Sequence, residues 1–453
     1  MRMNLDKTET GGQTLNTKEY KYFCENRFLG NLSSSSQSSH GEINKDNVVL
    51  PSVKPVQEIS HPADFRDFFK KRYPQTTLFT KPSTHVFHST DFLLTVAPNI
   101  SEELISPENL AEIHDLARHL KEGVTSFFGF EFRLMSNDAR SDYLIAVSSK
   151  KREREALLET MKSLPEKFLQ LNEWHRVKDL TEKWMDPNSI LHDRVLGIWL
   201  EFDTTNKGVK TPVPNVFLQT IPLRIDESKD VEKCSWVTRV AIPLLTGSKV
   251  SKKLENKFFE ALEKLPKHAS VFHVASMIAR DTKGGIRLVI KRIKPEEIIP
   301  YLESLGWREN SEGKLKTLLD ELKNYSNCIR LHINISDHVH PKVGLECFIS
   351  PERYHEVDRW EEFFDYLVSK NLCLPNLRDA LLGFPGVTQE DLSQEFTFES
   401  YVPSVKIEDN GFSKALVRYI SHVKISYDPK SSVEAKAYIG VRLFSRRWAV
   451  GQN

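Results

Sequence analysis

The sequence predicts an α+β fold, namely an antiparallel ten-stranded barrel built from about five helix-helix-strand-strand (ααββ) units with the helices outside. Two observations predict it. From about residue 61 onward, charged stretches with apolar residues at three-to-four spacing alternate with pairs of short stretches in which apolar and polar residues alternate. A sheet whose hairpins are each followed by helices can also close on itself, which removes its exposed edges.

The expected elements follow in five rounds. Residues 62–72 are the candidate for the first helix of the first round. The other elements, with helices before strands in each round, are 107–122, 124–134 and 141–147; 151–164, 173–185, 195–203 and 215–223; 235–245, 251–265, 270–278 and 286–293; 295–305, 313–325, 329–336 and 343–349; and 354–369, 375–382, 420–427 and 434–444.

Composition predicts one large domain behind a tail. Residues 1–55 are rich in Ser, Asn and Gly and offer few apolar groups, so we expect a disordered or loosely ordered arm, followed by a single barrel domain over 56–453. With 63 Lys and Arg against 62 Asp and Glu, the chain has no global field that would recruit nucleic acid or an anionic membrane. It also has no apolar run long enough to cross a bilayer.

The cysteines predict a reducing compartment. The sequence has five, widely scattered and without a C-x-x-C spacing, which fits neither a disulfide framework nor a zinc knuckle. The first residues lack the apolar segment of a secretory signal. We therefore expect a cytoplasmic protein.

The strands share an unusual division of faces. In 329–336, four aliphatic residues lie on one face, and Arg330, His332 and Asn334 lie on the other. Such a polar face is either the wet side of an open sheet or the lining of a solvated barrel lumen. Glycines on the polar faces favour the lumen, because a crowded interior gains from Gly and a wet face does not. They are Gly197, Gly344 and Gly440.

A lumen of this kind would gather cations. A cluster of cations in a low dielectric needs an anion to neutralise it, which predicts a phosphate or diphosphate guest. Aromatic ring faces could then shelter a carbocation, so the pattern indicates allylic transfer chemistry. The basic candidates are Arg287, Lys291, Arg330, Lys342, Lys424, Lys436 and Arg442, with His332 beside them. The aromatic candidates are Trp199, Phe217, Phe348, Tyr427 and Tyr438.

Five ααββ repeats with inward Arg and Lys, and the K-x-Y pattern Lys436-Ala437-Tyr438, resemble the ABBA-type prenyltransferases over roughly residues 60–445. The resemblance implies that the basic lumen residues hold an isoprenoid diphosphate and that Tyr427 and Tyr438 shield it. It also implies that Glu201 is the catalytic base that orients the acceptor, although Glu201 and Asp203 could instead be a plain pair of carboxylates at the end of a strand. No cofactor is required by this resemblance, and magnesium would be optional. The K-x-Y pattern occurs cleanly once in this sequence, whereas the family has it on several strands.

The sequence therefore predicts an enzyme of natural product biosynthesis that moves an isoprenyl group from an allylic diphosphate to an aromatic, peptide or small-molecule nucleophile. Two other interpretations stay open: a non-catalytic barrel that binds an anionic or lipid-like ligand, and an open α+β protein-interaction scaffold. The segment His338-Val339-His340, followed by Glu346, is similar in spacing to cupin metal sites, but Pro341 favours a hairpin turn with exposed histidines.

Overall fold

The computed structural model describes residues 88–149, 152–204, 212–226, 230–280, 285–308, 313–349, 357–389, 402–403 and 412–447. The expected arm 1–55 and the candidate helix 62–72 lie outside these residues, so both stay predictions. The described part of the first unit begins with another helix, α3 (Ser89–Val96). No helix in the described ranges combines the length and apolar character needed to span a membrane.

The elements follow the predicted five rounds. The first has α3, a short 3-10 turn (Ala97–Asn99), α4 (Pro107–Ala117), β1 (Phe127–Arg133) and β2 (Ser141–Ser148). The second has α5 (Glu153–Ser163), α6 (Glu166–Leu169), α7 (Asn172–Met185), α8 (Ile190–Arg194), β3 (Val195–Phe202) and β4 (Pro214–Leu223). The third has α9 (Glu232–Trp236), a π-helical turn (Val237–Ala241), α10 (Ile242–Thr246), α11 (Lys252–Glu263), β5 (Ser270–Ser276) and β6 (Ile286–Lys291).

The fourth round has α12 (Pro295–Ser304), α13 (Lys314–Leu322), β7 (Cys328–Ile335) and β8 (Val343–Phe348). The fifth has α14 (Val357–Ser369), α15 (Pro375–Leu382), the short strands β9 (Gly386–Gln389) and β10 (Val402–Pro403), and the long hairpin β11 (Phe412–Tyr427) and β12 (Glu434–Arg447). Helix α4 illustrates why these segments are helical, since Ser106 Oγ accepts from Asn109 N–H at its start and Pro107 occupies the first turn.

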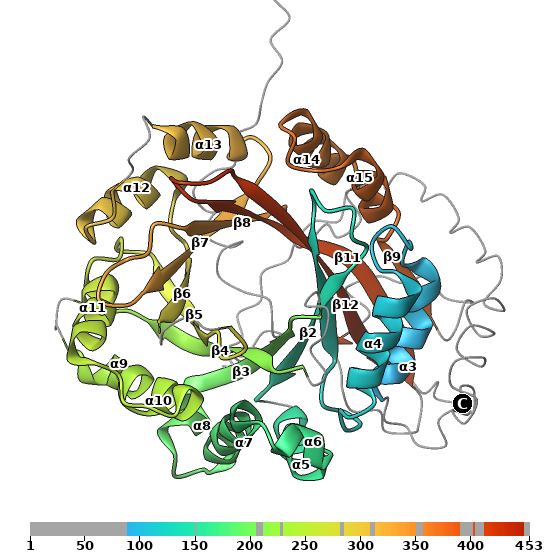
Figure 1. Ribbon diagram of the computed structural model, residues 1–453, viewed down its shortest axis with the longest axis horizontal. Coiled ribbons are helices and arrows are strands. Elements are labelled where there is room, and N and C mark those ends of the chain that lie inside the picture. Colours follow the sequence, from blue (N-terminus) through green and yellow to red (C-terminus); the bar gives the residue numbers. More distant parts are fainter. Residues whose placement is uncertain are drawn as a thin grey trace, which may run out of the picture.

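The sheet closes into a barrel. Each of β1 to β7 pairs antiparallel with the next strand, β8 pairs with β11, β11 pairs with β12, and β12 returns to β1 with Phe127 opposite Arg442. Figure 1 shows the helices arranged as a ring around these strands. The predicted α+β barrel with ten strands in its closed ring and outer helices is confirmed, and the open-sheet scaffold is excluded.

The apolar core lies between the barrel and the helices. In β7 the outward residues Ile329, Leu331, Ile333 and Ile335 are buried in this core, and the helices turn their apolar faces toward it. Cys234, Cys328, Cys347 and Cys373 are buried, and none of these four forms a disulfide. Because the core takes the aliphatic face of each strand, the polar face must point into the lumen.

The structure differs from the prediction at β11, which begins at Phe412 rather than at residue 420. The pairing of β11 with β12 shifts between Ile420 and His422, so Ser421 forms a bulge. A bulge adds one residue to the strand and reverses the inside-outside alternation on either side of it. The alternation of inward and outward residues is therefore broken at Ser421, and for this reason the sequence pattern did not predict the first half of β11.

Candidate functional site

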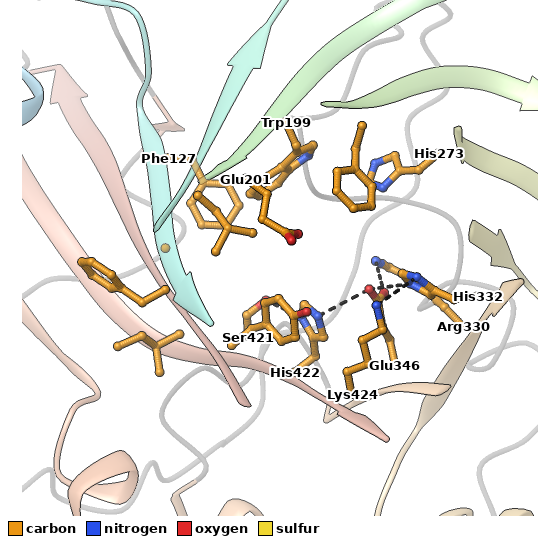
Figure 2. Close-up of a pocket in the computed structure, with 16 residues that line it drawn as sticks. Phe127, Trp199, Glu201, His273, Arg330, His332, Glu346, Ser421, His422 and Lys424 are labelled. Atoms are coloured by element: carbon orange, nitrogen blue, oxygen red, sulfur yellow. Dashed lines mark hydrogen bonds and ion pairs between the residues drawn. The ribbon is translucent and has the colours of Figure 1, made fainter. Parts of the chain in front are cut away.

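The barrel encloses a cavity with about 690 Å³ of empty space, part of it open to solvent. Figure 2 shows Phe127 and Trp199 on one side of this cavity and Arg330, His332 and Lys424 on the opposite side. The lining includes Phe127, Gly129, Leu144, Trp199, Glu201, Phe217, His273, Arg330, His332, Glu346, Ser421, His422, Lys424 and Tyr438.

One wall of the cavity is aromatic. The rings of Phe127 and Trp199 meet edge to face with centroids 5.0 Å apart, and Phe127 also stacks on Tyr419 at 6.1 Å. Phe217 lies opposite Trp199 in the β3–β4 pairing, and Trp199 packs against it. These residues form a continuous apolar surface that an aliphatic chain could contact.

The centre of the cavity holds basic groups around one buried carboxylate. His332 Nε2 lies 2.6 Å from Glu346 Oε1, His422 Nε2 lies 3.5 Å from the same oxygen, and Arg330 Nη1 lies 3.9 Å from Glu346 Oε2 (Figure 2). Lys424 Nζ lies 3.2 Å from His332 Nδ1. The guanidinium of Arg330 stacks on Phe348, with Cζ 4.0 Å from the ring centroid.

Burial and like charges shift the pKa values of these groups. Burial, followed by the nearby Arg287, lowers the pKa of Lys424 to about 8. Burial lowers the pKa of His332 to about 4. Burial opposes the ionisation of Glu346, but its contacts with His332 and His422 hold its pKa well below the usual range. At neutral pH the carboxylate is therefore charged and the His332 ring is neutral.

A second set of charged groups lies toward the end of the barrel where the hairpins turn. Arg280 Nη2 lies 2.7 Å from Glu201 Oε1, and Arg280 Nε donates to Asp203 Oδ2 at 2.7 Å. Glu131 accepts hydrogen bonds from Lys436 Nζ and from the Tyr438 hydroxyl. The barrel thus supplies internal carboxylates to several of its own cations, which the sequence-based argument for an external anion did not include.

Two of these acids have opposite pKa shifts. Burial, and then the neighbouring Glu131 charge, raises the pKa of Glu201. Burial acts the same way on Glu131, but Lys436 and Lys424 outweigh it and lower the pKa of Glu131. Glu201 therefore has more proton affinity than Glu131, which is the property a base in this cavity needs.

Most of the sequence-predicted residues lie inside the barrel. Glu201, Arg330, His332, Lys424 and Tyr438 line the cavity itself. Four more belong to the surroundings of the cavity. Arg287 Nε donates to Asn334 Oδ1 at 2.9 Å, Lys436 pairs with Glu131, Lys291 Nζ lies 5.5 Å from the Phe272 ring centroid, and Arg442 Cζ lies 5.6 Å from that of Phe127.

The predicted placement of Tyr427 and Lys342 in the lumen is wrong. Tyr427 is buried in the core between barrel and helices, because it shares the outward face of β11 with Val423 and Ile425. Lys342 precedes β8, has a half-exposed side chain and pairs with Glu434 at 2.7 Å on the surface. Lys342 would share the inward face with Gly344 and Glu346 if the strand included it, but β8 begins one residue later, at Val343.

Sequence reasoning missed Glu131, His273, His422 and Phe127 as site residues, and it considered Glu346 only as a metal ligand. The signal for Glu131 and Phe127 was weak because β1 reads Phe-Phe-Gly-Phe-Glu-Phe-Arg, in which both faces carry aromatic residues. His338 and His340 lie in the turn between β7 and β8, as predicted. Among the described side chains, no three His, Cys, Asp or Glu take an arrangement suited to a metal ion.

As predicted, two of the glycines lie where the lumen is too crowded for a side chain. A Cβ atom on Gly344 would lie 2.9 Å from Lys424 Cε, and one on Gly440 would lie 2.8 Å from Phe127 Cε2. Both distances are too short for a methyl group, so these positions leave room for the neighbouring side chains that face the cavity.

Neither a protein-family model nor a curated protein sequence matches this chain. Solved structures do. The chain is similar to the prenyltransferase PriB in its apo form, with a TM-score of 0.46 and 10% identity, over 78% of this chain and 94% of that one. It is similar to 5-dimethylallyltryptophan synthase from Streptomyces coelicolor, with a TM-score of 0.43 and 12% identity, over 77% and 93%.

A third similar structure is AnaPT from Neosartorya fischeri, with a TM-score of 0.41 and 12% identity, over 87% of this chain and 100% of that one. The solved structures to which this chain is similar thus include a protein named a prenyltransferase. The barrel itself is established by the strand pairing of this chain.

Proposed function

We propose that the lumen binds an allylic isoprenyl diphosphate and that the protein transfers the isoprenyl group to an aromatic, peptide or small-molecule nucleophile. One observation carries the proposal: a surplus of cations and an aromatic wall meet in a single cavity. The cations Arg287, Arg330 and Lys424 surround the centre of the lumen, where Glu346 supplies one negative charge. A multiply negative ligand would neutralise the remainder.

The low pKa of Lys424 supports this assignment. An ammonium group loses proton affinity where other cations and burial surround it, and it regains that affinity when an anion arrives. Lys424 would therefore contact the diphosphate together with Arg330, whose planar guanidinium can donate to two phosphate oxygens. Lys291, Lys436 and Arg442 would add positive charge from neighbouring positions on the inner surface.

The aromatic wall would receive the isoprenyl chain. Phe127, Trp199 and Phe217 offer apolar contact to the chain and negative ring faces to an allylic cation. In the reaction, the bond between the allylic carbon and the diphosphate oxygen breaks, and its electron pair leaves with the diphosphate. The acceptor's nucleophilic atom then bonds to the allylic carbon, and the proton it loses passes to a base.

Glu201 is the candidate base. Its carboxylate points into the cavity (Figure 2), and its raised pKa suits proton acceptance. Arg280 holds the carboxylate in place at 2.7 Å. Protein cations would neutralise the leaving diphosphate, so this proposal requires no metal ion or organic cofactor.

The test is to incubate the protein with dimethylallyl, geranyl and farnesyl diphosphate and a panel of indoles, phenols and peptides, and to measure prenylated products by mass spectrometry. We expect product from the wild type and at least a hundredfold loss in Arg330→Ala and Lys424→Ala. Lys342→Ala removes a surface lysine as the matched control and should keep full activity. Absence of product with every pair would contradict the transferase proposal.

A binding measurement beside this assay separates transfer from binding alone. If the wild type binds an allylic diphosphate by calorimetry but forms no product with any acceptor, the lumen is a binding site for an anionic, lipid-like ligand. Two observations favour this second candidate function, binding without transfer. The K-x-Y pattern occurs on only one of the predicted strands, and histidines lie near the centre of the cavity.

A further inference from the structure

The carboxylate at the centre of the lumen is the feature that the proposed function does not use. Glu346 is 8% exposed and projects from β8 into the middle of the basic cluster. The strand register places it opposite Arg330 on β7 and opposite Lys424 on β11. It therefore occupies the position at which the cations from both neighbouring strands converge.

We propose that Glu346 is an internal counter-ion at the anion site, and that an anionic ligand binds there together with protons taken up by His332 and His422. The inference rests on the proposed function to the extent that the ligand carries a phosphate or diphosphate group. It applies equally to an enzyme and to a binding protein.

The geometry explains the role of the carboxylate. Before a ligand arrives, Arg330 and Lys424 lie close together on the lining of a largely buried cavity, and their mutual repulsion is costly in a low dielectric. Glu346 reduces that cost. Once a phosphate group lies beside the same cations, Glu346 becomes a second negative charge near it and weakens binding, unless neighbouring groups become more positive.

The two histidines are placed to become more positive. Both Nε2 atoms face Glu346 Oε1, at 2.6 Å for His332 and 3.5 Å for His422. His422 is also sandwiched between aromatic rings, at 4.7 Å from Phe348 and 4.2 Å from Tyr438 between centroids, which fixes its orientation. Protonated rings at these positions would neutralise Glu346 and leave Arg330 and Lys424 available to the ligand.

The charged and titratable groups that face the histidines come from every adjacent strand. They are His273 on β5, Arg287 on β6, Arg330 on β7, Glu346 on β8, Lys424 on β11 and Tyr438 on β12. Burial and the cations among them keep both rings neutral without ligand, which is consistent with the lowered pKa of each histidine. A bound phosphate adds negative charge and raises both pKa values, so affinity should increase as the pH falls below the pKa of the bound state toward the lower pKa of the free state.

The experiment is calorimetry with inorganic diphosphate as the probe, between pH 6 and 8.5, in buffers of different ionisation enthalpy. For the wild type we expect proton uptake on binding and an affinity that falls as the pH rises. Glu346→Gln removes the internal charge and should bind diphosphate about tenfold more tightly or better. Glu434→Gln, which removes an exposed carboxylate paired with Lys342, is the matched control and should behave as the wild type.

Loss of the histidines tests the proton uptake separately. His332→Gln with His422→Gln should bind diphosphate with fewer protons taken up than in the wild type and with a weaker pH dependence between pH 6 and 7, where Lys424, with a pKa of about 8, is already charged. If Glu346→Gln is poorly folded on its own, its melting temperature with saturating diphosphate gives a second measure, since the ligand should raise it more than it raises that of the wild type.

The outcomes separate the two proposals. Wild-type binding without tightening in Glu346→Gln, or without proton exchange, overturns the counter-ion inference and leaves the proposed function intact. Binding by Glu346→Gln alone supports the inference and contradicts the wild-type diphosphate site. Absence of binding in both proteins overturns both.

Discussion

Glu131 on β1 and Tyr438 on β12 face each other across the seam that closes the barrel, and the tyrosine hydroxyl donates to the carboxylate. Lys436, also on β12, donates to the same carboxylate. Glu131 is 2% exposed, so these contacts replace the water that an ionised carboxylate would otherwise require. One buried acid therefore joins the first and last strands of the ring.

The seam contact should contribute to stability. Glu131→Gln keeps the shape of the side chain but removes the charge, leaving Lys436 without its buried partner. We expect the free energy of unfolding to fall by about 2 kcal/mol, measured by urea denaturation at pH 7. Since the native pKa of Glu131 is lowered, its contribution is present above the ordinary carboxyl pKa and is lost as the pH falls through the native pKa.

The control for this variant is Glu434→Gln, because Glu434 at the start of β12 forms an exposed ion pair with Lys342. An exposed pair is worth less than about 1 kcal/mol, so the midpoint of unfolding should barely move. Equal stability of Glu131→Gln and wild type would show that the strand hydrogen bonds hold the seam without this acid.

Asp142 should make stability decline as the pH rises. It lies opposite Glu131 in the β1–β2 pairing, and burial followed by the Glu131 charge raises its pKa to about 7. The folded state therefore favours the protonated acid, and that stabilisation is lost as the pH rises from the unfolded pKa near 3.8 through about 7. Asp142→Asn cannot ionise, so between pH 5 and pH 8 its unfolding free energy should fall by about 1–2 kcal/mol less than that of the wild type.

The measurement is a series of urea titrations at several pH values for both proteins. Arg133 Nη2 lies 3.1 Å from Asp142 Oδ2, and an asparagine oxygen can still accept from it. Parallel pH profiles for the two proteins would mean that Asp142 stays ionised in the fold.

Trp199 should limit the length of the isoprenyl chain. Its ring lies against Phe127 and Phe217 in the apolar part of the cavity, and Trp199→Ala would open that space. If the protein is a transferase, the ratio of kcat/KM for geranyl over dimethylallyl diphosphate should rise by about tenfold or more, because the added carbon atoms gain apolar contact. Competition assays with product analysis by mass spectrometry give the ratio directly.

A tryptophan from the outer core is the control. Trp360 is buried between the barrel and the helices, so Trp360→Phe should leave the ratio unchanged. A ratio that stays constant in Trp199→Ala would place the end of the chain elsewhere in the lumen.

The division of strand faces was predictable from sequence because the side chain of each residue on a strand can point only to one face of the sheet or to the other. In β7, and in β12 as far as Leu443, every second residue is aliphatic, and the structure places these aliphatic residues in the outer core. The same rule identifies Tyr427 as an outward residue, since it is two positions from Ile425. Assigning it to the lumen from its aromatic type alone ignored its parity.

The internal carboxylates were harder to predict. Sequence parity places Glu346 and Glu131 inside the barrel, but which strands are neighbours decides which charges meet. Glu131 finds its partners on β12, and the Ser421 bulge decides how His422 and Lys424 align with Glu346 and Tyr438. These relationships depend on closure and register, which a single sequence does not reveal.

Closure of the barrel also affects when the chain can complete its fold during synthesis. Glu131 and Tyr438 are 307 positions apart, so a ribosome exposes β1 long before β12 exists to cover its free edge. During that interval the strand edge and its aromatic residues are open to mispairing with other nascent chains. A chain that stops before β11 would retain most of its helices and have no interior compartment, and we expect such a product to aggregate or be degraded.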